Sequence, residues 1–385
     1  MTIFERLGVT PVINAVGTNT RLGGGLMHPK VAAAMVDASR LCCDMLDLQA
    51  AACRAIRGAT GAEAGIVTSG ASAAILLGAA ACLAGLDPAR MNRLPDVQGR
   101  REIIVVRSQR NMYDRALVVA GAKLVEIGIP DRYSGPGVRD AEAWEIEDAI
   151  GPETAAIYYL AHKHSLPALG AVAELARRRG VPVLVDAAAQ LPPAANLRAF
   201  IQAGADLVAF SGGKAIGGPQ ASGILCGRVD LVSSALLQML DLDMHHDAWR
   251  APAEFAPLAQ LRGLPHHGIG RSCKTGKEEI VGLVTALQLF TGEEDGERRF
   301  KWTMLLGEIK EAAAPLWGAD VLDAGPVPIL RWRTFRAAEI AAALRDGSPS
   351  IACALVDGAL HFSPVALTPE HAGIIGRRLK ELARP

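Results

Sequence analysis

The sequence has no excess of charge and no paired cysteine motif. Its 40 lysine and arginine residues are balanced by 40 aspartate and glutamate residues. A neutral chain has no general attraction to nucleic acid or to an anionic membrane, so any anionic ligand must be bound by local groups. The seven cysteines are scattered and form no CxxC pair. This usage is typical of reduced thiols in the cytoplasm rather than of a secreted disulfide framework.

The sequence also lacks a segment that is suited to crossing a membrane. Residues 1–12 have neither the basic nor the apolar region of a signal peptide. The stretch between Glu63 and Asp87 is uncharged, but its apolar part, residues 71–86, is shorter than the roughly 20 residues that a transmembrane helix needs. We therefore expect a buried strand, turn and helix there. No internal repeat is present, and 385 residues are enough for a substantial core and two domains.

Short apolar runs alternate with amphipathic stretches in the middle of the chain. This alternation predicts βαβ units and a mostly parallel α/β sheet that is covered on both faces. Ligands bind such sheets beyond the carboxyl ends of the strands. The expected strands are 65–68, 103–107, 123–127, 155–160, 181–186 and 207–210, and the clearest helices are 71–86, 141–150 and 169–179.

The last third of the chain predicts a smaller α+β domain. A helix at 277–290 is expected to continue through a charged segment into 300–316. It is followed by a strand at 329–333, a helix at 337–345, a hairpin of 351–356 and 359–362 around Asp357-Gly358, and a final helix. We predict an N-terminal arm at 1–30, a large domain at 31–295 and a small domain at 296–385.

A lysine follows the last of the predicted strands. Lys214 ends a Ser-Gly-Gly-Lys motif that begins at Ser211 and precedes Gly217 and Gly218. Weak solvation at a strand end lowers the pKa of a lysine and makes the neutral amine available for a Schiff base. The glycines would let a flat cofactor approach the backbone, and the Ser211 hydroxyl could reach a phosphate. A surface lysine in a glycine-rich turn is the alternative.

An aspartate ends the strand before it. Asp186 follows Val-Leu-Val, so its carboxylate is expected at the carboxyl edge of the sheet. There it could hold a pyridinium nitrogen protonated, with the small Ala188 beneath the ring and Gln190 close by. The alternative is that Asp186 caps the next helix.

A third motif precedes the helix predicted at 71–86. Ser69, Gly70 and Ala71 stand between a short strand and this helix. The N–H groups at a helix start form a ready phosphate site, although the motif could also be an ordinary cap. A phosphate cup, a strand-end Asp and a strand-end Lys, in this order in one α/β domain, predict a site for pyridoxal 5′-phosphate.

Longer motifs resemble one family of pyridoxal-phosphate enzymes. The sequence is similar to the family that joins bacterial seryl-tRNA selenium transferase to D-glucosaminate-6-phosphate ammonia-lyase, whose members have the aspartate-aminotransferase fold (fold type I). The likeness covers most of the chain and weakens after about residue 300. The motifs are PVINAxGT at 11–18, LGG at 22–24, GAEA at 61–64, VTSGA at 67–71, VDAAAQLP at 185–192, SGGK at 211–214, GGPQ at 217–220, IGR at 269–271 and KxGKEEIV at 274–281.

The resemblance implies roles for the strand-end residues. Lys214 would carry the cofactor as a Schiff base, and Asp186 would bind the pyridine nitrogen. The phosphate would lie among residues 69–71 and Ser211, near Gly217 or Gly218 of a partner subunit. A homodimer or larger homo-oligomer is implied. We choose Arg271 for the substrate carboxylate, which a planar guanidinium matches with two parallel bonds; a structural ion pair is the alternative.

Histidines interrupt the family pattern in three places. His-Lys-His follows the strand predicted at 155–160, and two His-His pairs occur at 245–246 and 266–267. We predict that His162 and His267 contact the substrate, as acid, base or anion-binding groups, and that they bind no metal. Exposed turns are the alternative. The residue that stacks on the cofactor ring is expected in segment 108–113, with Arg110, Asn111 and Tyr113 as candidates.

We interpret the sequence as a pyridoxal-phosphate lyase that acts on an amino acid or amino sugar acid. Lys214 would remove the Cα proton, and β-elimination would lead to a 2-oxo acid and ammonia. The same residues would serve a racemase or aldolase, an aminotransferase or a selenium transferase. A non-catalytic binding relative is a further alternative. The neutral charge and the absence of a basic N-terminal extension argue against tRNA as a ligand.

Overall fold

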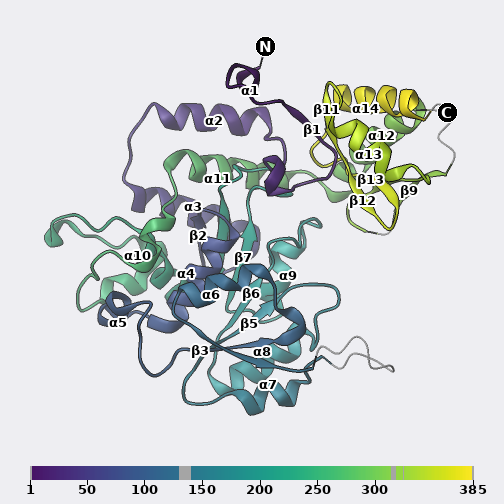
Figure 1. Ribbon diagram of the computed structural model, residues 1–385. Coiled ribbons are helices and arrows are strands. Elements are labelled where there is room, and N and C mark those ends of the chain that lie inside the picture. Colours follow the sequence, from purple (N-terminus) through teal and green to yellow (C-terminus); the bar gives the residue numbers. More distant parts are fainter. Residues whose placement is uncertain (1, 130–139, 314–317, 324, 384–385) are drawn as a thin grey trace. The chain divides into compact units, whose positions relative to one another are not determined.

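The computed structural model describes residues 2–129, 140–313, 318–323 and 325–383, and the chain forms two compact units (Figure 1). The larger unit is His28–Phe290, and the smaller unit combines Met1–Met27 with Thr291–Pro385. The N-terminal segment thus groups with the C-terminal part of the chain. The boundaries expected from the sequence (1–30, 31–295 and 296–385) stay a prediction about independent domains.

A seven-stranded, mostly parallel sheet is the centre of the large unit. Strands β7, β6, β5, β3 and β4 run parallel to one another, whereas β8 is antiparallel to both β2 and β7. The carboxyl ends of β5, β6 and β7 therefore meet at one edge of the sheet. In spatial order the strands are β2 (Ala64–Thr68), β8 (Gly223–Gly227), β7 (Leu207–Ser211), β6 (Val183–Asp186), β5 (Thr154–Leu160), β3 (Glu102–Val106) and β4 (Lys123–Ile127).

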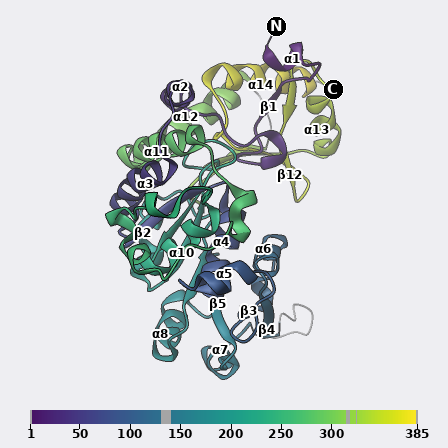
Figure 2. The ribbon, with the colours of Figure 1, turned by 90° about the vertical axis from the view of Figure 1, so that its left-hand side faces the viewer.

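Helices cover both faces of this sheet (Figure 2). One core contains α4 and α10, and the other contains α3, α8 and α11. Helix α4 is apolar on all sides and is almost fully buried, which explains why the sequence around it resembles a membrane segment. The helices are α2 (Pro29–Ser39), α3 (Met45–Thr60), α4 (Ala71–Ala84), α5 (Pro88–Arg93), α6 (Arg115–Val119), α7 (Ala143–Ala149), α8 (Leu169–Arg179), α9 (Asn196–Gln202), α10 (Val229–Met239) and α11 (Lys277–Gly292).

Strand β8 was missed in the sequence analysis. Its sequence, Gly-Ile-Leu-Cys-Gly, has glycine at both ends and only one β-branched residue, so the local signal for a strand is weak. All five residues are nevertheless buried, because β8 lies between β2 and β7. The other strands of the sheet occur where the apolar runs predict them.

The small unit contains a four-stranded sheet and a two-stranded one. Strand β1 pairs in parallel with β11, so part of the predicted arm is a strand of this unit. The larger sheet has the order β12-β13-β10-β9. The elements are α1 (Ile3–Arg6), β1 (Val12–Asn14), α12 (Asp295–Ala312), β9 (Ala319–Leu322), β10 (Ile329–Arg333), α13 (Ala337–Arg345), β11 (Ser350–Ala352), β12 (Ala354–Val356), β13 (Ala359–Phe362) and α14 (Pro369–Leu382).

Two expectations for this region were wrong in detail. The helix expected to run from 277 to 316 breaks after Gly292, and α12 begins anew with Glu294 as its N-cap. Residues 314–316 of the expected helix lie outside the described residues. The single strand expected at 351–356 is interrupted at Cys353, because β11 pairs with β1 whereas β12 pairs with β13. Among the described residues, no helix is long and apolar enough to span a membrane.

Candidate active site

Lys214 lies in a tight loop directly after β7. The Gly212 amide donates to the Ser222 carbonyl oxygen, and the Gly218 amide donates to the Gly212 carbonyl oxygen, both at 2.9 Å. A Cβ atom on Gly213 would lie only 2.6 Å from Cα of Gln220. Glycine is therefore required at this point, because the loop backbone packs directly against the segment that leads into β8. The loop holds the half-buried lysine at the carboxyl edge of the sheet.

The environment of Lys214 favours the neutral amine. Burial lowers the pKa of the Lys214 ammonium group, and the negative charge of Asp186 offsets part of this effect. The interpretation of Lys214 as a freely solvated surface lysine is thus not supported. An amine with a lowered pKa is the form that reacts with an aldehyde.

Asp186 is buried at the end of β6, with 4% of its surface exposed. Its Oδ1 accepts a hydrogen bond of 3.0 Å from the Ala188 amide, and its Oδ2 accepts one of 3.0 Å from the Tyr158 hydroxyl. Asp186 is not the cap of the following helix, because α9 begins after Ala195. A carboxylate has about four lone-pair sites, so two donors leave room for a third.

The Asp186 partner Tyr158 was not identified from the sequence. It lies on β5, next to β6, and it is 1% exposed. Burial and then the charge of Asp186 raise the pKa of the Tyr158 hydroxyl above its usual range. The available signal was a tyrosine in an otherwise apolar strand, since a buried tyrosine usually finds a hydrogen-bond partner.

The segment before α4 presents uncapped backbone amides. Gly70 is the N-cap residue, with φ of 121°, and no side chain caps the helix. A Cβ atom on Gly223 of β8 would lie 2.5 Å from the Gly70 carbonyl carbon, so β8 packs closely against this loop. Ser69 donates its hydroxyl to the Cys273 carbonyl oxygen at 2.9 Å. The first turn of α4 contains no acidic residue, and its dipole favours an anion.

The remaining residues predicted to bind the cofactor lie along the same chain segments. Ala188 and Gln190 are half-buried and follow β6, and Ser211 is half-buried at the end of β7. The Gln190 carbonyl oxygen accepts a hydrogen bond of 2.6 Å from the Asn196 side chain. Gly218 is buried in the loop of its own chain.

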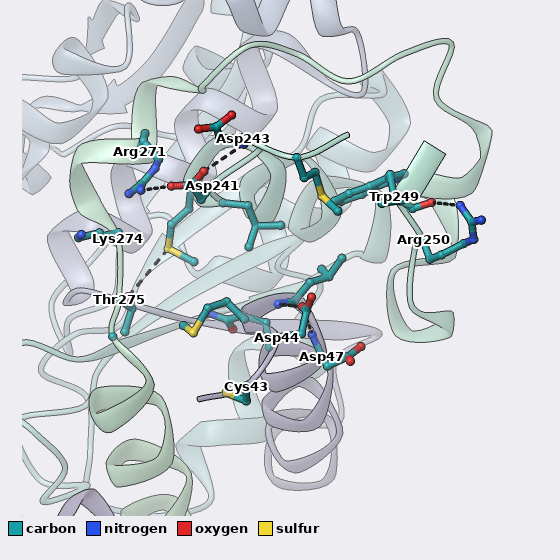
Figure 3. Close-up of a pocket in the computed structure, with 18 residues that line it drawn as sticks. Cys43, Asp44, Asp47, Asp241, Asp243, Trp249, Arg250, Arg271, Lys274 and Thr275 are labelled. Carbon is teal, nitrogen blue, oxygen red and sulfur yellow. Dashed lines mark hydrogen bonds and ion pairs between the residues drawn. The ribbon is translucent and has the colours of Figure 1, made fainter. Parts of the chain in front are cut away.

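A cavity of about 770 Å³ lies beside the loop before α4 (Figure 3). Arg271 forms an ion pair with Asp241 in its wall, and Nε2 of His267 lies 3.4 Å from Oδ1 of the same carboxylate. Lys274 lies near this pair, whereas Trp249 lies on the opposite side (Figure 3). The structure thus places Arg271 and His267 on the same carboxylate. The structural ion pair, which was the alternative to a substrate-binding role for Arg271, is present.

The two histidines of the turn after β5 lie on the surface. His162 and His164 are exposed in the turn after β5, with ring centroids 5.2 Å apart. No contact joins His162 to His267 in the structure. Among the described residues, no group of three or more His, Cys, Asp or Glu side chains is arranged to hold a metal ion.

Segment 108–113 is held by its neighbours on the sheet edge. Nε of Arg110 donates to Asp114 at 2.5 Å, and its guanidinium also forms an ion pair with Glu126. The Asn111 side chain lowers the pKa of the Tyr158 hydroxyl, and Tyr113 is 57% exposed. Arg110 is therefore committed to two carboxylates, while Asn111 is directed toward the Asp186 site.

These groups fit pyridoxal 5′-phosphate. The uncapped start of α4 suits the phosphate, buried Asp186 has an acceptor site left for a ring N–H, and burial lowers the pKa of Lys214. Parallel strands bring the last two residues to the same edge of the sheet, in an α/β fold of the aspartate-aminotransferase type. The protein is thus a pyridoxal-phosphate enzyme of fold type I, as the sequence predicts.

Comparison with known proteins identifies the family. The family model of L-seryl-tRNA selenium transferase matches residues 12–244, and the chain belongs to this family. A 5′-C-glycyluridine monooxygenase-decarboxylase from Streptomyces sp is 31% identical over 98% of this chain and 91% of its own length. D-glucosaminate-6-phosphate ammonia lyase from Salmonella typhimurium is 28% identical over 99% of this chain and 98% of its own.

A solved structure confirms the fold over the full length. The structure of D-glucosaminate-6-phosphate ammonia-lyase is similar with a TM-score of 0.81 and 27% identity, and the match covers 100% of this chain and 98% of that one. The family resemblance, the fold class and the cofactor predicted from the sequence are confirmed.

Proposed function

We propose that this protein is a pyridoxal-phosphate lyase that releases ammonia from an amino acid or amino sugar acid. The observation that carries the proposal is the full-length similarity to an ammonia-lyase, with a TM-score of 0.81. The Lys214 and Asp186 pair at the sheet edge supports it.

Bound pyridoxal phosphate would supply an aldehyde that captures the substrate amine and a ring that withdraws electrons from Cα. The neutral Lys214 amine would then take the proton from Cα of the substrate. Asp186 would hold a proton on the ring nitrogen, and the amides of residues 71–73 would bind the phosphate. Loss of water, or of a similar group, from Cβ and hydrolysis would yield a 2-oxo acid and ammonia. In this proposal Ser211, Ala188, Gln190 and Gly218 line the cofactor site.

Arg271 is our candidate for binding an anionic group of the substrate. Its present partner, Asp241, is 55% exposed at the side chain, so this ion pair is only partly removed from solvent and is exchanged at little cost. His267 contacts the same carboxylate. We propose that His267 assists Arg271, and that His162 contacts the substrate from the turn after β5. An anionic substrate would thus replace Asp241 as the partner of Arg271.

Product analysis tests the reaction. D- and L-amino acids and amino sugar acids are first screened for a change in the visible spectrum of the holoenzyme. We expect a responding compound to give ammonia and a 2-oxo acid in equal amounts, without oxygen. Exchange of the Cα proton alone would indicate a racemase, release of an aldehyde an aldolase, and amine transfer an aminotransferase. Any of these outcomes would overturn the lyase.

A second function is favoured by the relative that is 31% identical, because its name describes a monooxygenase-decarboxylase. This second reaction would begin with the same capture of the substrate amine. The bond from Cα to the carboxylate would then break, and dioxygen would be consumed. Carbon dioxide release that depends on dioxygen, with no 2-oxo acid, distinguishes this reaction from ammonia elimination.

We include the assembly and the location in the proposal. The glycine-rich segment 17–25 and the family resemblance support a homodimer or larger assembly that completes each site. The scattered cysteines support the cytoplasm.

A further inference from the structure

A buried chain of hydrogen bonds leads away from Asp186. The Tyr158 hydroxyl donates to Oδ2 of Asp186 at 3.0 Å, and the Asn111 side chain acts on the same hydroxyl by lowering its pKa. Oδ1 of Asn111 already accepts the Tyr113 amide at 2.7 Å, so the Asn111 amide nitrogen is the group that faces Tyr158. Three segments far apart in sequence are thereby joined at the sheet edge.

Each member of this chain is fixed by its own surroundings. Tyr158 and Asp186 lie on neighbouring parallel strands and are both buried. Asn111 is the N-cap residue of the short 3₁₀ helix η3 (Met112–Asp114) and forms a capping box with Asp114. The backbone N–H of Asn111 donates to Oδ2 of Asp114 at 3.1 Å. The Tyr158 hydroxyl thus cannot turn away from Asp186 without losing the 3.0 Å hydrogen bond between them.

The Tyr158 bond determines which way the carboxylate faces. Oδ1 of Asp186 is held by the Ala188 amide and Oδ2 by Tyr158, so rotation of the carboxylate breaks a bond at either oxygen. Lys214 is the nearby cation, since the charge of Asp186 raises its pKa. Without Tyr158, the buried Oδ2 would lack a donor, and the carboxylate would gain most by turning toward the Lys214 ammonium group.

We infer that Tyr158 is a positioning residue that orients Asp186 toward the ring nitrogen of the cofactor, and that Asn111 holds Tyr158 in this role. The inference rests on the proposed role of Asp186. Tyr158 needs no contact with substrate or cofactor for this function. It acts by keeping the carboxylate turned away from Lys214 before the cofactor binds.

The test uses Tyr158→Phe, which keeps the buried ring and removes only the hydroxyl. Tyr159→Phe is the matched control, because Tyr159 is the next residue of β5 and packs in the core on the other face of the sheet. Its hydroxyl makes only a 3.5 Å contact with the Ser165 carbonyl oxygen. The readouts are the dissociation constant of pyridoxal phosphate and the ¹⁵N chemical shift of cofactor labelled at the ring nitrogen.

We expect Tyr158→Phe to weaken cofactor binding about ten-fold, the size of one hydrogen bond to a charged group. Its ¹⁵N shift should move toward that of Asp186→Asn, whereas Tyr159→Phe keeps the values of the unmodified protein. An unchanged shift and affinity in Tyr158→Phe, with a displaced shift in Asp186→Asn, would overturn the inference alone. An unchanged shift in Asp186→Asn would instead overturn the cofactor role of Asp186.

Asn111→Ser keeps the inference testable should Tyr158→Phe fail to fold. Serine preserves a cap for η3 but is too short to replace the amide that reaches Tyr158. We expect a smaller change in the same direction for both readouts. Values equal to those of Tyr159→Phe would overturn the inference.

Discussion

Lys214 is the residue on which the proposed chemistry of this protein most depends. Its loop is closed by two backbone hydrogen bonds and by glycines that no other residue could replace without a clash. The amine is thereby held in a place where water stabilises its charge poorly. This placement makes the Lys214 amine more reactive and also lowers the stability of the folded protein.

Reduction of the holoenzyme with borohydride should attach the cofactor covalently to Lys214. We expect purified protein to be yellow and to yield one labelled peptide that contains this lysine. Lys214→Ala should lose the adduct, because Lys214 is the amine on which the charge of Asp186 acts. Lys274→Ala, which removes an exposed lysine from the neighbouring cavity wall, should retain it. A stable adduct on another lysine of the unmodified protein would refute the assignment.

Lys214→Met should raise the thermal midpoint of the cofactor-free protein at pH 7. Folding lowers the pKa of Lys214 below its ordinary value of 10.5, so the folded state binds fewer protons than the unfolded state. Lys214 thus lowers the free energy of unfolding by its full amount at low pH, and this loss of stability fades as the pH rises toward 10.5. We expect the gain from Lys214→Met to shrink between pH 7 and pH 10, and Lys274→Met to show no such trend. A gain in thermal midpoint that grows with pH would contradict a lowered pKa for Lys214.

Among the elements, β2 shows how a sheet edge is prepared for a binding loop. β2 is the edge strand next to β8 and leads directly into residues 69–71, the proposed phosphate loop. Gln49 of α3 covers this edge: its side chain donates to the Val67 carbonyl oxygen at 2.9 Å and accepts from the Val67 amide at 3.0 Å. The side chain is 2% exposed and satisfies both backbone groups. Helix α3 therefore helps to fix the loop from outside the sheet.

Gln49→Ala should destabilise the protein by about 2–6 kcal/mol, because two buried backbone groups lose their partners at about 1–3 kcal/mol each. Pyridoxal-phosphate binding should weaken as well, since β2 is the support of the phosphate loop. Denaturant unfolding and a cofactor titration measure the two effects. The control is Gln202→Ala, an exposed glutamine at the end of α9, with an expected change within about 0.5 kcal/mol. Equal stability of the two variants would show that Gln49 does not support the edge.

On the scale of the whole molecule, the N-terminal helix α1 has an apolar surface that its own chain leaves open. Ile3 and Phe4 are each 54% exposed, and Leu7 is 70% exposed. No residue of α1 is buried. Such a short helix is stabilised little by itself, so its apolar side chains are suited to burial against a second subunit.

We predict an obligate homodimer or larger assembly with an interface above about 2,000 Å². Leu7→Glu should shift the assembly toward the monomer and lower cofactor occupancy, as sedimentation velocity and absorbance would show. Arg6→Glu is the control. It changes the charge of the same helix by more than Leu7→Glu does but removes no large apolar side chain, so we expect this variant to assemble normally. Deletion of residues 1–25 is a less selective test, because it also removes β1, the partner of β11. A fully active monomer would contradict the prediction.

The net charge of the whole molecule bears on whether it binds tRNA. The formal net charge is zero, and tRNA binding depends on local cation excess. We expect no retention of tRNA in a filter-binding assay at low salt, at protein concentrations where the holoenzyme is active. Saturable retention that falls steeply as salt is added would support the selenium-transferase alternative.

The sequence by itself determined the features that reside in short segments. Dense valine and isoleucine predicted β3, β4 and β6, and the residues just beyond the apolar runs predicted a cofactor site at Lys214 and Asp186. These signals are local, because strand propensity, loop glycines and a strand-end side chain all lie within a few neighbouring residues.

Only the tertiary structure decided which distant residues meet. It placed β8 between β2 and β7, joined β1 to β11, paired Arg271 with Asp241 and placed the Tyr158 hydroxyl on Asp186. Each of these contacts links segments that are 12 or more residues apart, such as Ser211 of β7 and Gly223 of β8. The hydrophobic period of one strand specifies which face is buried, but not the neighbour and the register against which that face packs.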